Sequence, residues 1–336
     1  MRALVLGGSV FVGRRLVEHL VARGDEVTVL NRGRTASDLP PDVARLVADR
    51  TDLASMHAAL AGTSWDAVFD VSGFVMAARG SDVEGLLQLV DGNVGRYVYV
   101  SSIMAYDQSS VGLMPWSEDL PTDPAGPSTY GGFKAMAEAS MLARHRATGF
   151  PVTIVRPAAI YGPHNNIFDM ETPMFLRLLQ GRPILLPHGG LVTASYGHVD
   201  DLCDAMRELV GIEAATGEVV NITAEAVTTR RYVDVLARVV GREPDVVVVP
   251  DDRRDQLPAG IYGHLFSDRH HAVLSTEKAR LQLGLPPGRD HETGHRETYA
   301  WFLDQGGDRI EGALVDPMWR ATWDFAAEAD AAASLR

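Results

Sequence analysis

The sequence contains one cysteine, Cys203, and two lysines, Lys134 and Lys278, among 336 residues. A single cysteine excludes an internal disulfide and any metal centre built on several thiolates, and it is typical of a reducing compartment such as the cytoplasm. No apolar stretch approaches the roughly 18 residues of a membrane-spanning helix, and the apolar run at 1–6 is too short for a signal peptide. We therefore expect a cytoplasmic protein without a membrane partner.

Positive charge is also scarce, since 44 acidic residues outweigh 31 basic ones and give a net charge of −13. This balance argues against a broad surface for nucleic acid or anionic membranes, because both need clustered positive charge. Histidines gather late in the chain, at 264, 270, 271, 291 and 295. We expect these histidines to be exposed in loops and on a helix, and we expect no metal site.

Hydrophobic residues make up 46% of the chain, which is enough for a sizeable core, and the length suggests two domains. In the first half, short apolar runs alternate with amphipathic stretches of helical length, a pattern typical of βαβ units and a parallel sheet. The expected strands are 2–6, 26–30, 44–48, 66–71, 96–101 and 151–156, and the expected helices are 12–23, 52–61, 80–91 and 128–147.

Beyond Arg156 the alternation of strand-like and helix-like stretches is less regular, because prolines divide the chain into shorter pieces. The sequence predicts a smaller lobe there, with a polar loop over 251–271 and a frayed end over 326–336. Its expected helices are 172–180, 199–210, 228–240 and 290–305, with short strands near 184 and 219.

A glycine turn follows the first expected strand, in the run Gly7-Gly8-Ser9-Val10-Phe11-Val12-Gly13-Arg14. Glycines let the backbone approach a pyrophosphate, and the helix that follows offers free N–H groups and a partial positive charge. The placement directly after a strand favours a dinucleotide site. The alternative is a tight strand-to-helix turn without a ligand.

The end of the second strand bears on the choice of cofactor. A carboxylate there would bind the adenosine ribose of NAD, but the sequence has Asn31-Arg32-Gly33-Arg34. Two arginines suit a 2′-phosphate through charge-assisted hydrogen bonds, which favours NADP(H), with NAD as the alternative. A solvated basic turn would have the same sequence. Asp49, after the third strand, is placed to meet the adenine.

A tyrosine and a lysine stand four residues apart, at Tyr130 and Lys134. On a helix they share one face, so the ammonium should lie beside the phenol and lower its pKa from about 10. Tyr130 is therefore a candidate general acid and base, although this spacing also occurs on ordinary solvated helix faces.

Together with Ser101-Ser102 at the end of the fifth strand, these motifs resemble the extended short-chain dehydrogenase/reductase family, also called NAD-dependent epimerases/dehydratases. The glycine turn and residues 31–34 are most similar to a divergent branch that includes the chloroplast stem-loop RNA-binding proteins. The resemblance implies an α/β fold, with a Rossmann-type doubly wound parallel sheet in 1–160 and a smaller substrate-binding α/β lobe in 161–336, with some exchange of chain between them.

The resemblance also implies a catalytic triad of Ser102, Tyr130 and Lys134, in which Ser102 holds the substrate oxygen and Lys134 the nicotinamide ribose. The implied cofactor-binding residues are Gly7, Gly8, Ser9, Phe11, Val12, Gly13, Arg14, Asn31, Arg32, Arg34, Asp49, Arg50, Val71, Ser72, Gly73, Tyr130, Lys134 and Pro157. The implied substrate-binding residues are Ile103, Met104, His164 and Asn165.

Several positions depart from the family pattern. Val10 replaces a usual glycine, and Ile103-Met104 replace the Asp-Glu pair of sugar-nucleotide dehydratases. Ala159 and Ala194 stand where sugar-nucleotide enzymes commonly have Asn and Arg. We therefore expect hydride transfer at a carbinol or ketone carbon of a sugar, polyol or specialised metabolite.

The alternatives are a nucleotide-sugar 4-epimerase and a non-catalytic, dinucleotide-binding protein that acts in regulation or with RNA. The expected partners are a small-molecule substrate and, by family habit, a second copy of the chain in a homodimer.

Overall fold

The computed structural model describes residues 1–34, 38–71, 80–107, 109, 112, 114–165, 170–258, 261, 270–310 and 324–336. The contacts divide the chain into two compact units. The first consists of Met1–Ala159, Val199–Thr223 and Leu274–Pro287, and the second of Ile160–His198, Ala224–Val273 and Gly288–Arg336.

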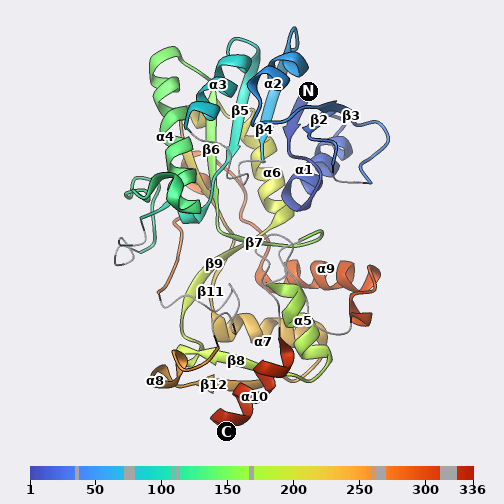
Figure 1. Cartoon of the computed structure of the whole chain (residues 1–336), viewed down its shortest axis with the longest axis vertical. Helices are drawn as coiled ribbons and strands as arrows, with labels where there is room; N and C mark the ends of the chain where they lie inside the picture. Colours follow the sequence, from blue (N-terminus) through green and yellow to red (C-terminus); the bar gives the residue numbers. More distant parts are fainter. Residues whose placement is uncertain are drawn as a thin grey trace. The chain divides into compact units, whose positions relative to one another are not determined.

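The first unit is built on a seven-stranded sheet in the order β10-β6-β5-β4-β1-β2-β3, and every neighbouring pair is parallel (Figure 1). The strands are β1 (Arg2–Leu6), β2 (Glu26–Asn31), β3 (Ala44–Val47), β4 (Trp65–Asp70), β5 (Val94–Val100), β6 (Val152–Pro157) and β10 (Val219–Ile222). The strand order reverses between β1 and β4, and the carboxyl ends of strands at such a point form the usual ligand crevice of an open α/β sheet.

Helices cover both faces of this sheet. On one face, α2 (Leu53–Leu60), α3 (Gly80–Val90) and α4 (Tyr130–Thr148) share a buried apolar cluster with Leu4 and Leu6 of β1. Side chains alternate along a strand, so Ala3 and Val5 point to the other face, where α1 (Phe11–Ala22) and α6 (Val199–Leu209) pack. Short helical turns η1 (Ile103–Ala105), η3 (Gly126–Ser128), η5 (Glu213–Ala215) and η6 (Lys278–Gln282) complete the unit.

This architecture confirms the predicted doubly wound α/β fold. The six strands and four helices expected before residue 157 all form, and their ends lie within two residues of the predicted ones. The strand near 219 and the helix at 199–210 were assigned to the second lobe, and that assignment is wrong. Val219 of β10 pairs with Ile154 of β6, so β10 is the edge of the large sheet, and α6 packs beside α1.

The second unit contains two small sheets. One has the order β11-β9-β7, with β7 (Ala159–Tyr161), β9 (Thr193–His198) and β11 (Ala226–Thr228), and the other pairs β8 (Pro183–Pro187) with β12 (Asp245–Val249). The helices are α5 (Glu171–Leu179), α7 (Thr229–Val240), α8 (Asp251–Arg254), α9 (His291–Asp304) and α10 (Phe325–Leu335), with turns η4 (His188–Gly190) and η7 (Gly307–Arg309). Within the described part of the chain, no helix is long and apolar enough to cross a bilayer.

The expected polar loop at 251–271 begins with the short helix α8, and its residues 259–260 and 262–269 lie outside the described residues. The expectation of a frayed end at 326–336 is wrong, because these residues belong to the helix α10. Asp324 caps α10 by accepting hydrogen bonds from the backbone N–H groups of Ala326 and Ala327. Glu328 then forms a buried ion pair with Arg177 of α5, at 2.6 Å, which ties the helix to its unit. The alanine-rich sequence of residues 326–336 does not by itself indicate either the cap or the ion pair.

The histidines of α9 also differ from expectation. His291 and His295 were expected to be exposed, but their exposed fractions are 2% and 0%. Their ring centroids lie 4.2 Å apart, and Tyr161 lies 3.9 Å from His295. Residues 291–295 have the H-E-x-x-H spacing of a metal-binding helix, which was overlooked in the sequence, but Glu292 pairs with Arg238 at 2.9 Å.

The two buried imidazoles are held in their neutral form. Neither ring nitrogen of His291 or of His295 has a hydrogen-bond partner among the described residues. Burial disfavours the charged form, so the pKa of His291 is lowered to about 4 and that of His295 lies well below its usual 6.5.

We expect the free energy of unfolding to decrease as the pH falls from 6.5 toward 4. The folded-state pKa values lie below the unfolded ones, so the unfolded state binds more protons in this window. For His291 alone the difference corresponds to about 3 kcal/mol. Urea unfolding at pH 7 and pH 5 measures the effect, and His295→Phe should reduce the pH dependence while His57→Gln, on the exposed face of α2, leaves it unchanged. An unaltered pH dependence in His295→Phe would contradict this.

Candidate active site

The glycine turn between β1 and α1 requires glycine at two positions. Gly7 has a positive φ of 98°, and its backbone N–H donates to Leu30 of β2 at 3.1 Å. At Gly13 a Cβ atom would lie 2.3 Å from the Gly7 carbonyl oxygen, far inside contact distance. The turn therefore brings the first turn of α1 directly against the end of β1.

The N-terminus of α1 is suited to an anion. Its N-cap residue, Val10, makes no side-chain capping bond, and the first turn of α1, which is fully described, contains no acidic residue. The first N–H groups of the helix are thus left for a ligand, together with the positive end of the helix dipole. These features fit a dinucleotide pyrophosphate, even though Val10 replaces the usual glycine.

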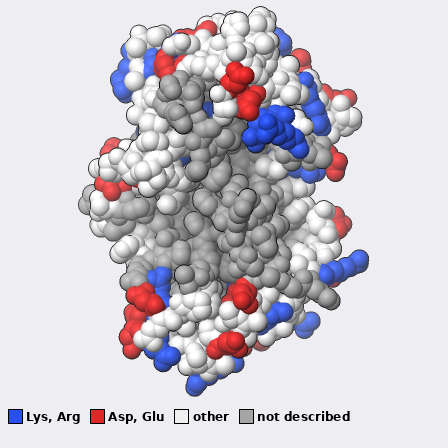
Figure 2. Space-filling view, viewed as in Figure 1, with Lys and Arg blue, Asp and Glu red and all other residues white. Residues whose placement is uncertain are grey.

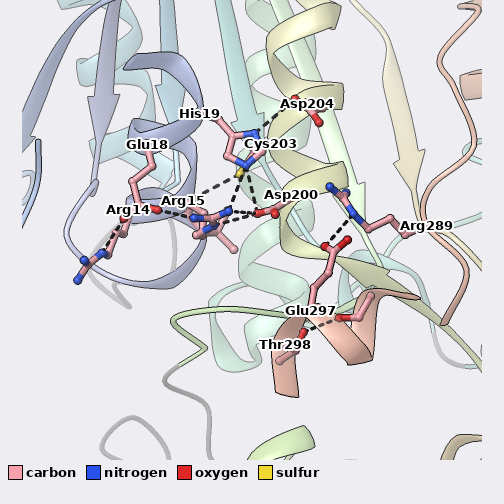
Figure 3. Close-up of polar contacts among 12 residues, drawn as sticks. Arg14, Arg15, Glu18, His19, Asp200, Cys203, Asp204, Arg289, Glu297 and Thr298 are labelled. Carbon is pink, nitrogen blue, oxygen red and sulfur yellow. Dashed lines mark hydrogen bonds and ion pairs between the residues drawn. The ribbon is translucent and has the colours of Figure 1, made fainter. Parts of the chain in front are cut away.

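Ion pairs join α1 to α6 (Figure 3). Arg15 donates to Asp200 of α6 at 2.8 Å, and His19 lies 3.2 Å from the same carboxylate and 3.3 Å from Asp204. The hydrogen bond to Asp200 raises the pKa of His19. The Cys203 thiol of α6 lies 3.9 Å from the Val12 carbonyl oxygen of α1. These contacts with α6 hold α1, the helix that follows the glycine turn, in place.

The predicted adenosine end of the site lies at the carboxyl ends of β2 and β3. Asn31 links two loops, since its amide donates to Ser9 at 2.8 Å and its carbonyl oxygen accepts from the Gly33 N–H at 2.8 Å. Arg32 and Arg34 are exposed. Hydrogen bonds from Thr51 lower the pKa of Asp49, and the charges of Arg32 and Arg34 contribute to the same direction.

Two predicted arginine contacts have other partners. Arg14 donates to Glu18, one turn further along α1, at 3.0 Å. The guanidinium of Arg50 binds the buried carboxylate of Asp70 at the end of β4, with Nη2 to Oδ2 at 2.6 Å. The contacts of Arg14 and Arg50 with a cofactor stay predictions. The Arg50 side chain points into the interior of the unit, where it binds Asp70.

The structure brings Ser102, Tyr130 and Lys134 together at the carboxyl end of β5. Ser102 is the N-cap of η1, where its hydroxyl accepts from the Met104 N–H at 3.1 Å, and its side chain also acts on Tyr130 by lowering the pKa of the phenol. Tyr130 is the first residue of α4, and Lys134 follows one turn later. Ser101, the neighbour of Ser102, is buried and bonded instead to Glu138 of α4.

Two glycines after Tyr130 permit this closeness. A Cβ atom on Gly131 would lie 1.9 Å from the Met104 carbonyl oxygen, and one on Gly132 would lie 2.4 Å from the Gly126 carbonyl oxygen. The first turn of α4 is therefore packed against the backbone of both η1 and η3. Any larger side chain there would push Ser102 away from Tyr130.

The expected effect of Lys134 on Tyr130 is wrong in this structure. Burial raises the pKa of the Tyr130 phenol to about 12, against a lowering by the Ser102 hydrogen bond. The Lys134 ammonium lies 5.8 Å from the Tyr130 ring centroid and donates to the Val100 carbonyl oxygen at 2.6 Å. Its own pKa is lowered to about 8, chiefly by burial. The prediction from helical spacing put Tyr130 and Lys134 on one face of the helix, but it did not account for the loss of hydration that burial imposes on both side chains.

The remaining predicted residues are distributed over both units. Val71 follows β4 and Pro157 ends β6. Ile103 and Met104 form part of η1, and Met104 is 39% exposed. Ser72 and Gly73 lie outside the described residues. His164 and Asn165 belong to the second unit, where the buried Asn165 amide donates to Glu171 at 3.0 Å. A substrate contact for this pair stays a prediction.

Two buried ion pairs near the triad were missed in the sequence. Arg156 of β6 binds Glu138 of α4 at 2.6 Å, and Arg50 binds Asp70. A signal was present, because Asp70 ends the otherwise apolar segment Ala67-Val68-Phe69 and a charge inside a buried strand requires a partner.

The doubly wound sheet with its glycine turn is that of a dinucleotide-binding protein. The chain belongs to the NAD dependent epimerase/dehydratase family, whose sequence profile matches residues 3–223. This confirms the resemblance predicted from the motifs.

The chain is 29% identical to the chloroplast stem-loop binding protein of 41 kDa b of Arabidopsis thaliana, over 92% of this chain and 81% of that protein. It is 30% identical to the dTDP-glucose 4,6-dehydratase of Streptomyces antibioticus, over 90% of this chain and 93% of the relative. The crystal structure of a Bacillus anthracis dTDP-glucose 4,6-dehydratase in complex with NAD has a TM-score of 0.73 at 20% identity, over 90% and 97% of the two chains, which shows a shared fold.

We predict that Gly13→Ala weakens dinucleotide binding at least tenfold, because the added Cβ would collide with the Gly7 carbonyl oxygen. Gly211→Ala is the matched control, since its Cβ would meet nothing closer than 3.7 Å. Isothermal titration with NAD⁺ and NADP⁺, alongside thermal melting, separates lost affinity from lost folding. Wild-type affinity in Gly13→Ala would show that the ligand does not use this turn.

Proposed function

We propose that the protein is an NAD(P)-dependent oxidoreductase or epimerase that transfers hydride at a carbinol or ketone carbon of a sugar, polyol or specialised metabolite. The observation that carries this proposal is the placement of Ser102 at the end of β5 against Tyr130 at the start of α4, with Lys134 one turn further along α4. Hydride transfer needs one proton donor or acceptor and one group that polarises the substrate oxygen, and this arrangement supplies both.

The bound dinucleotide would donate or accept the hydride. In the reducing direction, Ser102 would orient the substrate carbonyl and the Tyr130 hydroxyl would give its proton to the carbonyl oxygen as the carbon gains hydride. With a pKa of about 12 the Tyr130 phenol is protonated at neutral pH, as an ordinary phenol is, and it is still a stronger acid than the alcohol that the reaction would form. Lys134, one helical turn after Tyr130, would hold the nicotinamide ribose, as the family resemblance implies.

The residues around Tyr130 favour proton transfer over elimination. Ile103 and Met104 occupy the turn beside Tyr130, and neither can act as an acid or a base. Ala159 and Ala194 offer no charge for a substrate diphosphate, so we place a non-nucleotide substrate ahead of a nucleoside-diphosphate sugar.

Two alternatives rest on the names of the relatives. A nucleotide-sugar 4-epimerase is supported by similarity to the UDP-glucose 4-epimerase of Mycolicibacterium smegmatis, which is 26% identical over 91% of this chain and 99% of that protein. A non-catalytic, RNA-associated role is supported by similarity to a stem-loop binding protein, but the net charge of −13 disfavours it. On the face seen in Figure 2, acidic and basic side chains of the described residues are interspersed.

For the cofactor we infer NADP(H) in preference to NAD(H). The support is the exposed pair Arg32 and Arg34 after β2, where the position of the usual ribose-binding carboxylate is held by Asn31. We further infer a cytoplasmic setting, in keeping with the free thiol of Cys203, and a homodimer, which the family resemblance implies.

Tyr130→Phe should lower turnover at least 100-fold without changing cofactor affinity or melting temperature, because only the transferable proton is removed. Turnover is measured as NADPH oxidation with a panel of ketoses and keto-polyols, and epimerisation by NMR of the sugar. Tyr299→Phe, on α9 in the second unit, is the control. Undiminished turnover in Tyr130→Phe would favour the non-catalytic alternative.

Replacing Arg32 and Arg34 together by serine should raise the Kd for NADPH at least tenfold and leave the Kd for NADH nearly unchanged. The expected loss follows from charge-assisted hydrogen bonds to a 2′-phosphate. Fluorescence titration with both reduced cofactors gives the ratio, and Arg242→Ser tests for a nonspecific effect of lost surface charge. Equal weakening for NADPH and NADH would contradict the NADP(H) assignment.

A further inference from the structure

The Arg50–Asp70 pair lies on the sheet face that α4 covers. Asp70 of β4 is the register partner of Tyr99 in β5, so the two side chains point to the same face. Tyr97, two residues before Tyr99 on that face, donates its hydroxyl to Asp70 at 2.7 Å. α4 packs here, and the Lys134 ammonium lies 4.8 Å from the centroid of the Tyr99 ring.

Three charges are thus collected in the interior of the first unit. Asp70 is 0% exposed and Lys134 is 3% exposed, while the Arg50 side chain is 12% exposed. Water screens little at such depth, so each charge acts on the others more strongly than at the surface. Asp70 favours the charged form of Lys134, and Arg50 opposes it.

We propose that Arg50 and Asp70 form a positioning pair whose opposite charges set the electrostatic potential at Lys134, and so the balance between its ammonium and its neutral amine. Its relevance to turnover depends on the proposed function, but its effect on Lys134 does not. Arg50 follows Asp49 in the loop after β3, so the pair also joins the predicted adenine end of the site to the catalytic end.

The pair has a signature that a purely structural role would lack. Removing the Arg50 charge leaves the Asp70 carboxylate uncompensated, which should stabilise the Lys134 ammonium and raise its pKa. Removing the Asp70 charge leaves the guanidinium uncompensated, which should lower the same pKa. Two substitutions in one ion pair are therefore expected to act in opposite directions, whereas a general loosening of the fold would shift both the same way, toward the solvated value.

The sequence makes a direct measurement practical, because the chain has only two lysines, Lys134 and Lys278. Labelling lysine with ¹³C at Cε gives two NMR signals whose shifts follow ammonium titration, without substrate or turnover. Lys278 pairs with Glu218 at 2.7 Å, and its signal serves as the internal control.

Relative to the wild type, where Lys134 has a pKa of about 8, Arg50→Gln should move its titration upward and Asp70→Asn downward, each on the order of one pH unit. The double variant Arg50→Gln/Asp70→Asn should return it toward the wild-type midpoint. If Arg50→Gln does not fold, because it leaves a buried carboxylate unpaired, the comparison between Asp70→Asn and the double variant carries the test. Shifts of the same sign, or an unchanged Lys134 midpoint, would overturn the proposal.

The pH profile of kcat/KM then tests the link to turnover. The pH at which kcat/KM changes should shift together with the Lys134 titration in Asp70→Asn. In the double variant it should return to the wild-type pH. An unmoved profile beside a shifted Lys134 titration would overturn the catalytic part of the proposal. If Tyr130→Phe is fully active, the proposed function fails, but the NMR titration still decides whether the pair acts on Lys134.

Discussion

The hydrogen bond from the Lys134 ammonium to the Val100 carbonyl oxygen is the contact on which the candidate site depends. It joins the second turn of α4 to the last residue of β5, and the chain then continues directly into Ser101 and Ser102. A lysine can make this bond inside the unit because its charge is compact and its stem is apolar. The bond therefore holds the first turn of α4, which begins with Tyr130, at the end of β5.

Burying a cation at this point has consequences for its surroundings. The desolvation of Lys134 is offset only in part by two carboxylates, Asp70 of β4 and Glu138 of α4, so its pKa is still lowered to about 8. Each carboxylate is in turn bound to an arginine, Asp70 to Arg50 and Glu138 to Arg156. A buried carboxylate without such a partner would be strongly destabilising. The two ion pairs thus belong to the same electrostatic arrangement as the lysine.

The sequence predicted those parts of the structure that depend on local pattern. Periodicity identified the strands and helices of the first unit, and the motifs identified Ser102, Tyr130 and Lys134. It did not predict features that depend on distant contacts. The ion pair between Glu328 and Arg177 joins residues far apart in the chain, and it stabilises a helix where alanines suggested a frayed end. His291 and His295 were placed at the surface because helical spacing alone does not show which face is buried.

The same distinction explains the error about Tyr130. An i, i+4 spacing predicts proximity, but a pKa depends on how much hydration the phenol loses and on where the neighbouring cation points. Here the ammonium is directed to Val100, so burial dominates and the pKa of the phenol is raised. Gly131 and Gly132 produce that burial by admitting the backbones of η1 and η3 against the first turn of α4. The glycines that bring η1 and η3 against the first turn of α4 therefore also raise the pKa of the Tyr130 phenol.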